Sequence, residues 1–338
     1  MEGVLELTDS GYGFLRFDGY RSSDKDVYVS QIQIHRFNLK TGDKVKGIIR
    51  KPDEQERFGA MLFVKEVNGD EPSVAMHRTP FESLTPIYPT EQLRLDPEDE
   101  DSKLHVLDIL TPIGKGQRCI IAAPPKSGKT ELMKAVCRSI EEHHPECETI
   151  MLLVSERPEE ITDMKRSIKG DVVATSFDEP PAMQVKLAEL VLERAHRLAE
   201  HKKDVVVFLD SLPRLVRAYN YVVAPSGKLL AGGLDPAAFV RPKAFFGSAR
   251  NLQEGGSVTI LALAGTETLS RMDEFILEEF RGTANMELHL ERRLTETGIE
   301  TRIQMEKSMT KNDNLLISSE EIETAKKWRF DAKKDAMK

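Results

Sequence analysis

An eight-residue stretch in the first half of the chain has the residue types of a phosphate-binding loop. It reads Ala-Pro-Pro-Lys-Ser-Gly-Lys-Thr over residues 123–130 and follows an apolar run that predicts a strand over Arg118–Ala122. A helix is predicted directly after it, over Lys129–Glu142. A helix N-terminus offers backbone N–H groups and partial positive charge to phosphate. Ala123 stands where the general Walker A pattern has its first glycine, but the flanking strand and helix favour a Walker A loop over a chance match.

Two side chains of this loop suit a nucleoside triphosphate. We expect Lys129 to reach the β- and γ-phosphates and the Thr130 hydroxyl to bind Mg²⁺. A second candidate magnesium ligand is Asp210, which ends the apolar run Val205–Leu209. Because ligands of open α/β sheets bind at the carboxyl ends of the strands, Asp210 should face the same crevice. The sequence therefore predicts that ATP and Mg²⁺ are bound here.

A candidate for positioning the attacking water follows another apolar run, Thr149–Val154. Glu156 is expected to project toward the γ-phosphate from this strand end, and Arg157 is expected to touch phosphate or relay to a neighbour. A solvated surface pair is the alternative interpretation of these two residues.

The elements around these residues alternate between apolar strands and amphipathic helices. Further strands are predicted at Val172–Ser176 and Val258–Leu263, and further helices at Glu159–Lys169, Met183–Lys202, Asp235–Gln253 and Met272–Phe280. This alternation predicts an α/β fold with a mostly parallel sheet that is covered on both faces.

The N-terminal part of the chain has a different pattern, with short strands separated by turn residues. The strands are predicted at Val4–Leu7, Gly13–Phe17, Val27–Val29, Lys44–Arg50 and Ala60–Val67. Five short strands of this kind predict a small barrel of the oligonucleotide-binding type. We therefore divide the chain into a barrel domain over residues 1–70, a linker over 71–103 and an α/β domain over 104–338.

Composition argues against a membrane protein and a zinc site, but it does not decide whether the protein binds nucleic acid. The net charge is −8, although residues 1–68 balance eleven basic against eleven acidic residues, and a local basic surface is enough for phosphate contacts. The three cysteines have no CxxC spacing, which predicts reduced structural cysteines and no zinc site. The longer apolar runs are too short to cross a membrane, and the N-terminus does not resemble a signal peptide. We expect a cytoplasmic protein with no membrane partner.

Several stretches together resemble the Rho family of hexameric, RNA-dependent ATPases. They are VLDILTPIGKGQ (106–117), AAPPKSGKT (122–130), SERPEE (155–160), TSFDEP (175–180), HKKD (201–204) and GTANMELHL (282–290). The resemblance implies a RecA-like P-loop ATPase core with an N-terminal cold-shock-like barrel, in a homohexamer with ATP sites between subunits. It also implies a helicase-type translocase that binds pyrimidine-rich single-stranded RNA and promotes transcription termination by acting on the RNA polymerase elongation complex.

The resemblance assigns nucleotide contacts to two segments and to Arg157. The segments contain Gly114, Lys115, Gly116, Gln117, Arg118 and Cys119, then Lys126, Ser127, Gly128, Lys129, Thr130 and Glu131. Cys119 replaces the usual glycine of the family. Glu156 matches the glutamate that orients the attacking water.

The resemblance also assigns RNA contacts in the barrel and in two loops of the α/β domain. The barrel residues are Gly11, Tyr12, Gly13, Phe14, Leu15, Arg16, Asp26, Val27, Tyr28, Glu56, Arg57 and Phe58. Tyr12, Phe14 and Tyr28 can stack on unpaired bases. Tyr12 and Phe14 share one face of a strand, so a core role is the alternative, but the neighbouring glycines, Gly11 and Gly13, favour an open face. Lys228, in the loop Tyr221–Gly233, and Arg271, in the loop Thr266–Arg271, match contacts in the channel of the ring.

The chain departs from the family at several of these positions. Lys311 stands at the arginine finger that one subunit presents to its neighbour's ATP, and Glu300 stands at an adenine-stacking aromatic. Ser155, Pro213 and Leu269 replace an aspartate, a threonine and a glycine. Lysine keeps the charge of the finger but loses its planar fork.

These departures leave a second hypothesis open, a divergent regulator that binds ATP and RNA but hydrolyses ATP slowly. A DNA recombinase or rotary ATP synthase subunit is disfavoured, because neither joins an aromatic strand to an Ala-Pro-Pro-Lys loop.

Overall fold

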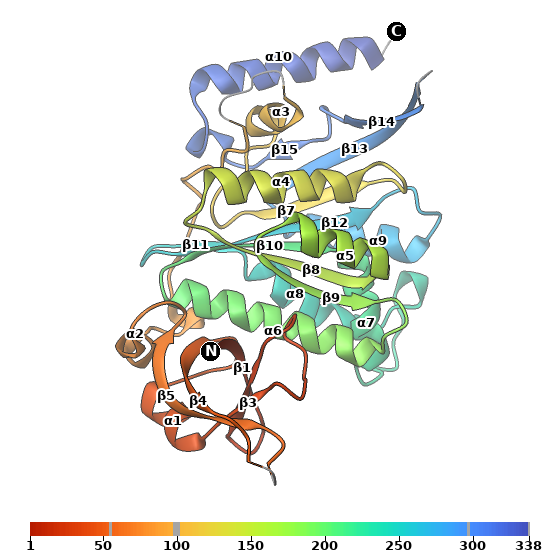
Figure 1. The fold of residues 1–338 in the computed structure, drawn as a ribbon. Coiled ribbons are helices and arrows are strands. Elements are labelled where there is room, and N and C mark those ends of the chain that lie inside the picture. Colours follow the sequence, from red (N-terminus) through yellow and green to blue (C-terminus); the bar gives the residue numbers. More distant parts are fainter. Residues whose placement is uncertain (54–55, 97–101, 296–297, 337–338) are drawn as a thin grey trace.

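A small β-barrel and a larger α/β unit make up the fold (Figure 1). The computed structural model describes residues 1–53, 56–96, 102–295 and 298–336. The barrel is closed in the order β1-β2-β3-β5-β4. Its elements are β1 (Glu2–Leu7), β2 (Gly13–Arg16), β3 (Val27–Val29), α1 (Gln31–Phe37), β4 (Lys44–Arg50) and β5 (Gly59–Val67). The predicted five-stranded barrel is therefore confirmed.

Helix α1 was not predicted, although its capping residues are visible in the sequence. Ser30 accepts a hydrogen bond from the Gln33 backbone N–H, and the Gln33 side chain reaches back to the backbone of Ser30. This capping box starts the helix, and Asn38 ends it in the left-handed conformation. The helix thus occupies the connection between β3 and β4.

The α/β unit is built around a mostly parallel sheet in the order β14-β13-β7-β12-β10-β8-β9. These strands are β7 (Arg118–Ala123), β8 (Glu148–Glu156), β9 (Asp171–Ser176), β10 (Asp204–Asp210), β12 (Ser257–Gly265), β13 (Met286–Thr295) and β14 (Gly298–Ile303). Short strands β6 (Pro86–Ile87), β11 (Arg250–Leu252) and β15 (Met309–Thr310) pair antiparallel at its margins. The predicted α/β class is confirmed.

Helices cover both faces of this sheet, since alternate residues of each buried strand enter different cores. One face packs on α3 (Lys103–Leu110), α4 (Lys129–His143) and α5 (Pro158–Ser167). The other packs on α6 (Pro181–Glu200), α7 (Leu212–Val222), α8 (Val240–Gly247) and α9 (Arg271–Arg281). The strands are apolar throughout because both of their faces are buried.

The segment predicted as a linker contains regular structure and buried side chains. It forms α2 (Pro72–His77), the 3₁₀ turn Phe81–Ser83 and β6. Phe81, Leu93 and Leu95 are buried in the cores of the α/β unit. The segment therefore packs along the α/β unit.

Buried polar contacts fix the barrel against α6 and the sheet. Arg78, whose side chain is fully buried, forms ion pairs with Asp43 of the barrel (2.5 Å) and Glu200 of α6 (3.0 Å). The Tyr20 hydroxyl of the barrel donates to the Asp171 carboxylate at the start of β9 (2.7 Å). These contacts hold the two parts in one orientation.

The helix predicted over Asp235–Gln253 is wrong at its C-terminal end. The segment forms the 3₁₀ turn Pro236–Phe239, then α8, and its last residues form β11 between β6 and β12. Besides α1, the helices α2, α3, α7 and α10 (Ser319–Ala336) were not predicted. Helix α10 lies beside α3 (Figure 1), where Arg329 donates to the Leu110 carbonyl (2.8 Å). Within the described ranges, no helix is long and apolar enough to cross a membrane.

Candidate functional site

The predicted phosphate loop connects β7 to α4, as expected for a Walker A loop. Gly128 caps α4 in the left-handed conformation (φ 72°), and no side chain caps the helix N-terminus. The orphan N–H groups of the first turn are therefore available to an anion. Lys126 and Gly128 are exposed, and Ser127 is buried beneath them. Glu131, in the first turn of α4, forms an ion pair with Lys134 (2.9 Å), so its carboxylate points along the helix surface.

Lys129 and Thr130 lie beside the carboxylate of Asp210, as the sequence predicts. The Thr130 Oγ1 donates to Asp210 Oδ2 (3.4 Å), and the positive charge of Lys129 acts on the same carboxyl. In the described part of the chain, the Lys129 ammonium makes no ion pair or hydrogen bond to a protein group. It is therefore free to meet a phosphate.

Asp210 is buried, and its charge is only partly compensated. Burial and then the charge of Glu156 raise the pKa of Asp210, while Arg214, Lys129 and Thr130 act against this rise. A hydroxyl and a carboxylate supply oxygen ligands of the kind that Mg²⁺ prefers, with the remaining positions left to water and phosphates. The described residues contain no cluster of three or more His, Cys, Asp or Glu able to hold a metal by themselves. The site thus fits a magnesium ion that arrives with a nucleotide.

Glu156 ends β8 and forms an ion pair with Arg214 in the first turn of α7. Strands β8 and β10 are parallel neighbours, with Leu153 opposite Asp210, so Glu156 lies at the same edge of the sheet. The Glu156 carboxylate also lies close to Glu160, whose pKa is raised by burial and then by Glu156. Because Glu156 is itself buried and is held by Arg214, it is an oriented acid in the crevice, and the interpretation of it as a solvated surface residue is wrong.

Arg157 follows Glu156 but points to solvent. Its side chain is largely exposed, with only a long ion pair to Glu160 (3.8 Å). It is free to turn toward a ligand at the carboxyl edge of the sheet.

The segment Gly114–Cys119 lies at the opposite edge of the sheet from the phosphate loop. β7 runs from Arg118 to Ala123, so this segment precedes the strand and the loop follows it. The Lys115 ammonium binds Glu91 (2.5 Å) and Asp204, at the start of β10 (3.0 Å), and the Cys119 side chain is buried in the core. Within one subunit, β7 therefore separates this segment from the loop, and the nucleotide contact of the segment stays a prediction.

Lys311 lies at that same amino-terminal edge. It follows β15, which pairs with the start of β13, where Met286 lies opposite Cys119 of β7. The Lys311 Nζ donates to the Ala284 carbonyl (3.1 Å). Lys311 thus lies near Arg118 and away from Lys129 of its own subunit. The side chain of Glu300 lies outside the described residues.

Four aromatic rings gather on one face of the barrel. Ring centroids lie 5.8 Å apart for Tyr12 and Phe14, 5.6 Å for Tyr12 and Tyr28, and 5.0 Å for Phe14 and Phe58. The guanidinium of Arg57 lies 5.1 Å from the Phe58 ring centroid. These rings are exposed or half-buried, so the alternative of a core role for Tyr12 and Phe14 is wrong.

Other barrel residues predicted to contact RNA support this face from beneath. The side chains of Leu15 and Val27 are buried in the barrel core and cannot touch a ligand, which corrects the prediction for them. Arg16 and Asp26 are buried and form an ion pair, and Arg16 also binds Glu6 (2.7 Å). The Arg16 guanidinium lies 5.3 Å from the Phe14 ring centroid, so the pair positions that ring.

The remaining predicted barrel residues border the aromatic face. Gly11 has a positive φ (81°) in the turn before Tyr12, and Gly13 begins β2. Glu56 binds Arg50 (2.7 Å) and Arg57 binds Asp24 (2.9 Å) at exposed positions. Charged side chains thus lie next to the rings on a surface that water can reach.

The two predicted channel loops meet at the start of α9. Gly232 packs so closely on Met272 that a Cβ there would lie 2.8 Å from the Met272 Cα. Lys228 and Arg271 are both exposed, and Leu269 is 100% exposed with a positive φ (58°). The loops therefore meet at Met272, and both cations are open to solvent.

Sequence reasoning did not predict the roles of Arg214 and Arg217. Arg214 holds Glu156, and Arg217, one turn later on α7, forms an ion pair with Asp273 on α9. The available signal in the sequence was that both arginines follow closely after Asp210, three residues apart and so on one face of a helix. Helix α7 therefore joins the end of β8 to the helix that follows a channel loop.

Comparisons with known proteins agree with this arrangement. Residues 1–73 match the family described as the Rho termination factor RNA-binding domain. Residues 103–310 match the nucleotide-binding domain of the ATP synthase alpha/beta family. Among solved structures, an ATPase of the type III secretion system of pathogenic bacteria shares the fold with a TM-score of 0.58 at 22% identity, covering 70% of this chain and 72% of that one. A Nanoarcheaum equitans ATP synthase subunit, NeqB, has a TM-score of 0.60 at 16% identity over 74% and 62% of the two chains.

Relatives of known identity are much more similar. Transcription termination factor Rho of Bacillus subtilis is 53% identical over 324 residues, covering 96% of this chain and 76% of that protein. The Escherichia coli Rho factor is 51% identical over 332 residues, covering 97% and 79%. The Neisseria gonorrhoeae Rho factor is 49% identical over 95% and 78%. With this identity over nearly its whole length, the chain belongs to the transcription termination factor Rho family.

Proposed function

We propose that this protein is an RNA-dependent ATPase that binds nascent single-stranded RNA and promotes transcription termination. The proposal rests on two features that occur in one chain. The barrel has an exposed aromatic face, and the α/β unit has a phosphate loop with Glu156 and Asp210 beside it. The chain acts as a homohexamer on the elongation complex of RNA polymerase, in the cytoplasm where nascent RNA is made.

ATP binds at the carboxyl edge of the sheet. The N-terminus of α4 and Lys129 hold its phosphates, because both lie in the loop and neither is occupied by a protein anion among the described residues. Magnesium, held through Thr130 and Asp210, supplies charge neutralisation for the phosphates. Arg157 is free to contact phosphate as well.

Glu156 orients the attacking water at the γ-phosphate. In this structure its carboxylate is occupied by Arg214 of α7, and α7 is joined through Arg217 and Asp273 to the helix behind the Thr266–Ser270 loop. RNA that contacts Arg271 or the loop can therefore act on Glu156 through α7. This connection gives the hydrolysis its dependence on RNA.

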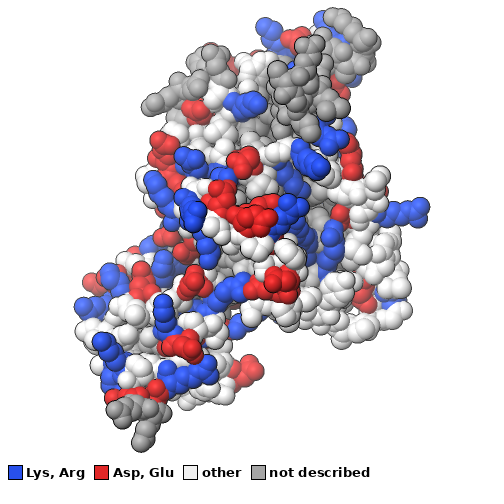
Figure 2. Space-filling model, turned by 45° about the vertical axis from the view of Figure 1, so that its right-hand side comes forward, with Lys and Arg blue, Asp and Glu red and all other residues white. Residues whose placement is uncertain are grey.

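RNA binds first at the barrel. Tyr12, Phe14, Tyr28 and Phe58 provide stacking platforms, and Arg57 provides a cation beside them. Figure 2 shows basic and acidic side chains mixed over the visible face of the molecule, so total charge does not mark this site. The RNA bound here is pyrimidine-rich, as the resemblance to the family implies.

The test is ATP hydrolysis by the purified protein with and without cytosine-rich single-stranded RNA, with Lys129→Ala as the blank. The proposal predicts strong stimulation by RNA that disappears in Lys129→Ala. Absence of hydrolysis with ATP and RNA binding intact would contradict it, and would favour the regulator that binds both ligands without turnover. This second function is favoured by Lys311, which stands in place of an arginine and lacks its planar fork.

A further inference from the structure

Helix α10 lies at the end of the molecule opposite the barrel (Figure 1) and contains a strongly basic stretch. Residues 326–334 read Lys-Lys-Trp-Arg-Phe-Asp-Ala-Lys-Lys, with five basic side chains and one acidic side chain. This local excess of positive charge contrasts with the net charge of −8 for the whole chain. None of the nucleotide or RNA contacts described above involves this stretch.

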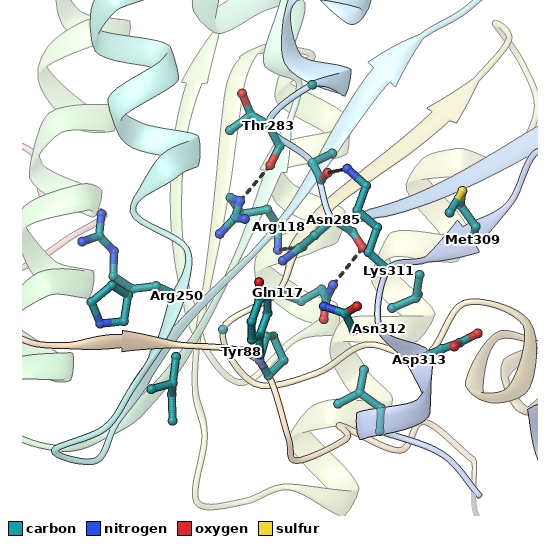
Figure 3. A pocket seen from close by; sticks show the side chains of 18 of the residues that line it. Tyr88, Gln117, Arg118, Arg250, Thr283, Asn285, Met309, Lys311, Asn312 and Asp313 are labelled. Carbon is teal, nitrogen blue, oxygen red and sulfur yellow. Dashed lines mark hydrogen bonds between the residues drawn. The ribbon is translucent and has the colours of Figure 1, made fainter. Parts of the chain in front are cut away.

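The inner face of α10 is fixed on the α/β unit. Ala325 is fully buried, and the Arg329 guanidinium donates to the Leu110 carbonyl at the end of α3 (2.8 Å). Near the start of the helix, Glu321 binds Arg94 (2.7 Å). Arg329 also lines a cavity of about 890 Å³ at the amino-terminal edge of the sheet (Figure 3). Arg329 therefore belongs to the packed side of the helix.

The outer face of α10 carries four lysines around one exposed aromatic ring. At about 100° per residue, these five side chains fall within an arc of about 120° of the helix. Phe330 is 59% exposed, and the Lys334 ammonium lies 4.5 Å from its ring centroid. The lysines are all exposed: Lys326, Lys327, Lys333 and Lys334. We call these four lysines and Phe330 the basic face of α10.

Most of the charge on the basic face has no partner in the protein. Lys326 pairs with Glu323 (2.6 Å), but both side chains are largely exposed, so solvent screens this pair. Among the described residues, Lys327, Lys333 and Lys334 form no ion pair. The basic face therefore carries three uncompensated ammonium groups.

A favourable interaction with the helix dipole explains only part of this pattern. Cations stabilise the last turn of a helix, where Lys333 and Lys334 lie. Lys326 and Lys327 lie at least about two and a half turns before the helix end at Ala336, and the dipole effect does not reach that far. The position of these two lysines beside an exposed ring fits an anionic ligand instead.

The combination of ammonium groups and an exposed ring fits single-stranded RNA better than an acidic protein. Lysines contact phosphates of any sequence, and an exposed ring stacks on an unpaired base. An acidic peptide would use the cations alone. The barrel combines a cation and a ring in the same way, with the Arg57 guanidinium 5.1 Å from the Phe58 ring centroid. The basic face thus has the same chemistry as the aromatic face of the barrel.

We propose that the basic face of α10 binds the phosphates of single-stranded RNA, with Phe330 stacking on one base. The inference rests on the proposed function, in which the protein engages RNA first at the barrel. Because α10 lies at the opposite end of the molecule (Figure 1), the two surfaces contact different parts of one long strand. A long RNA is then held at both surfaces, whereas a short oligonucleotide occupies the barrel alone.

The test measures RNA binding by the full chain at several salt concentrations, using fluorescence anisotropy. The variant carries three substitutions: Lys327→Gln, Lys333→Gln and Lys334→Gln. Each phosphate contact with a single strand contributes about 0.7 to the slope of log affinity against log salt concentration, so this slope should fall by about 2 for a long cytosine-rich RNA. The affinity for a cytidine oligonucleotide of about four nucleotides, which fits the barrel alone, should not change. Phe330→Ala should bind the long RNA at least about fivefold more weakly.

A matched variant removes three exposed basic side chains from another surface: Arg138→Gln on α4, Arg166→Gln on α5 and Lys169→Gln just after α5. These side chains also form no ion pair among the described residues, and the salt slope of this variant should equal that of the wild type. Glutamine keeps a high helix propensity, and thermal unfolding checks that both triple variants fold. RNA carrying a photoreactive base should also crosslink to α10 of the wild-type protein, which tests the contact without any substitution.

The outcomes separate this inference from the proposed function. An unchanged salt slope in the α10 variant, an equal change in the matched variant, an unchanged affinity in Phe330→Ala or the absence of a crosslink to α10 overturns the inference alone. Equal protection from the crosslink by polyglutamate and by RNA of the same charge would assign the basic face to an acidic protein, which also overturns it. If the wild type binds RNA at α10 but does not hydrolyse ATP, the proposed function fails and this inference stands.

Discussion

Replacing Tyr28 with alanine tests whether the aromatic face of the barrel is the RNA site. Tyr28 is 36% exposed and lies against Tyr12 and Phe14, with ring centroids 5.6 Å and 6.2 Å away. Stacking of one base on an aromatic side chain contributes about 1–3 kcal/mol. Loss of one platform should therefore weaken RNA binding by about 5- to 150-fold, since 1.4 kcal/mol is about tenfold in Kd.

The assay is fluorescence anisotropy of a labelled cytidine oligonucleotide at fixed salt, with thermal unfolding measured in parallel. Phe63→Ala is the matched control, because Phe63 is a 58% exposed aromatic on β5 of the same barrel that makes no ring contact with the cluster among the described residues. Its RNA affinity should equal that of the wild type. Unchanged affinity in Tyr28→Ala, or an equal loss in Phe63→Ala, would refute the reasoning.

Four further changes test other parts of the structure. Asp210→Asn should abolish hydrolysis but raise the free energy of unfolding above neutral pH by about 1 kcal/mol. The reason is that the pKa of Asp210 is raised in the fold, so its ionisation destabilises the folded state as pH rises through that pKa. In denaturant titrations, the difference in unfolding free energy from wild type should vanish at acid pH. Tyr20→Phe removes a hydrogen bond to Asp171 and should cost about 1 kcal/mol in thermal unfolding without changing the Kd for RNA. Arg78→Met removes the ion-pair partner of the buried Asp43 carboxylate and one partner of Glu200, and should cost about 3–5 kcal/mol in the same assay, whereas a loss under 1 kcal/mol would contradict the buried network. Lys311→Arg restores a planar fork and should raise RNA-stimulated hydrolysis at least about tenfold, which steady-state kinetics would show.

The sequence predicted the strands of the barrel and β7, β8, β9, β10 and β12 of the sheet because their signals are local, whereas β6, β11, β13, β14 and β15 were not predicted. β3 (Val27–Val29) and β4 (Lys44–Arg50) have the predicted bounds, set by turn residues on either side. The helix over Asp235–Gln253 was wrong because its last residues pair with β6 and β12, which are remote in the sequence. Strand pairing of this kind overrides the local preference for a helix, and it produces no periodic pattern of apolar residues in the sequence.

In the candidate site too, features with a local sequence signal were predicted and most contacts between remote segments were not. Lys129, Thr130 and Asp210 meet as predicted, since strand order in an open sheet brings carboxyl ends together. The resemblance assigned nucleotide contacts both to the Gly114–Cys119 segment and to the loop, and the direction of β7 places these two at opposite edges of the sheet.

Transcription through a cytosine-rich template with a purified bacterial RNA polymerase tests the central claim most directly. The account predicts that the protein and ATP release shortened transcripts, and that release is lost with Lys129→Ala, with Tyr28→Ala at low protein concentration, or with an ATP analogue that cannot be hydrolysed. Full-length transcripts alone, under conditions where the protein hydrolyses ATP on the same RNA, would contradict it.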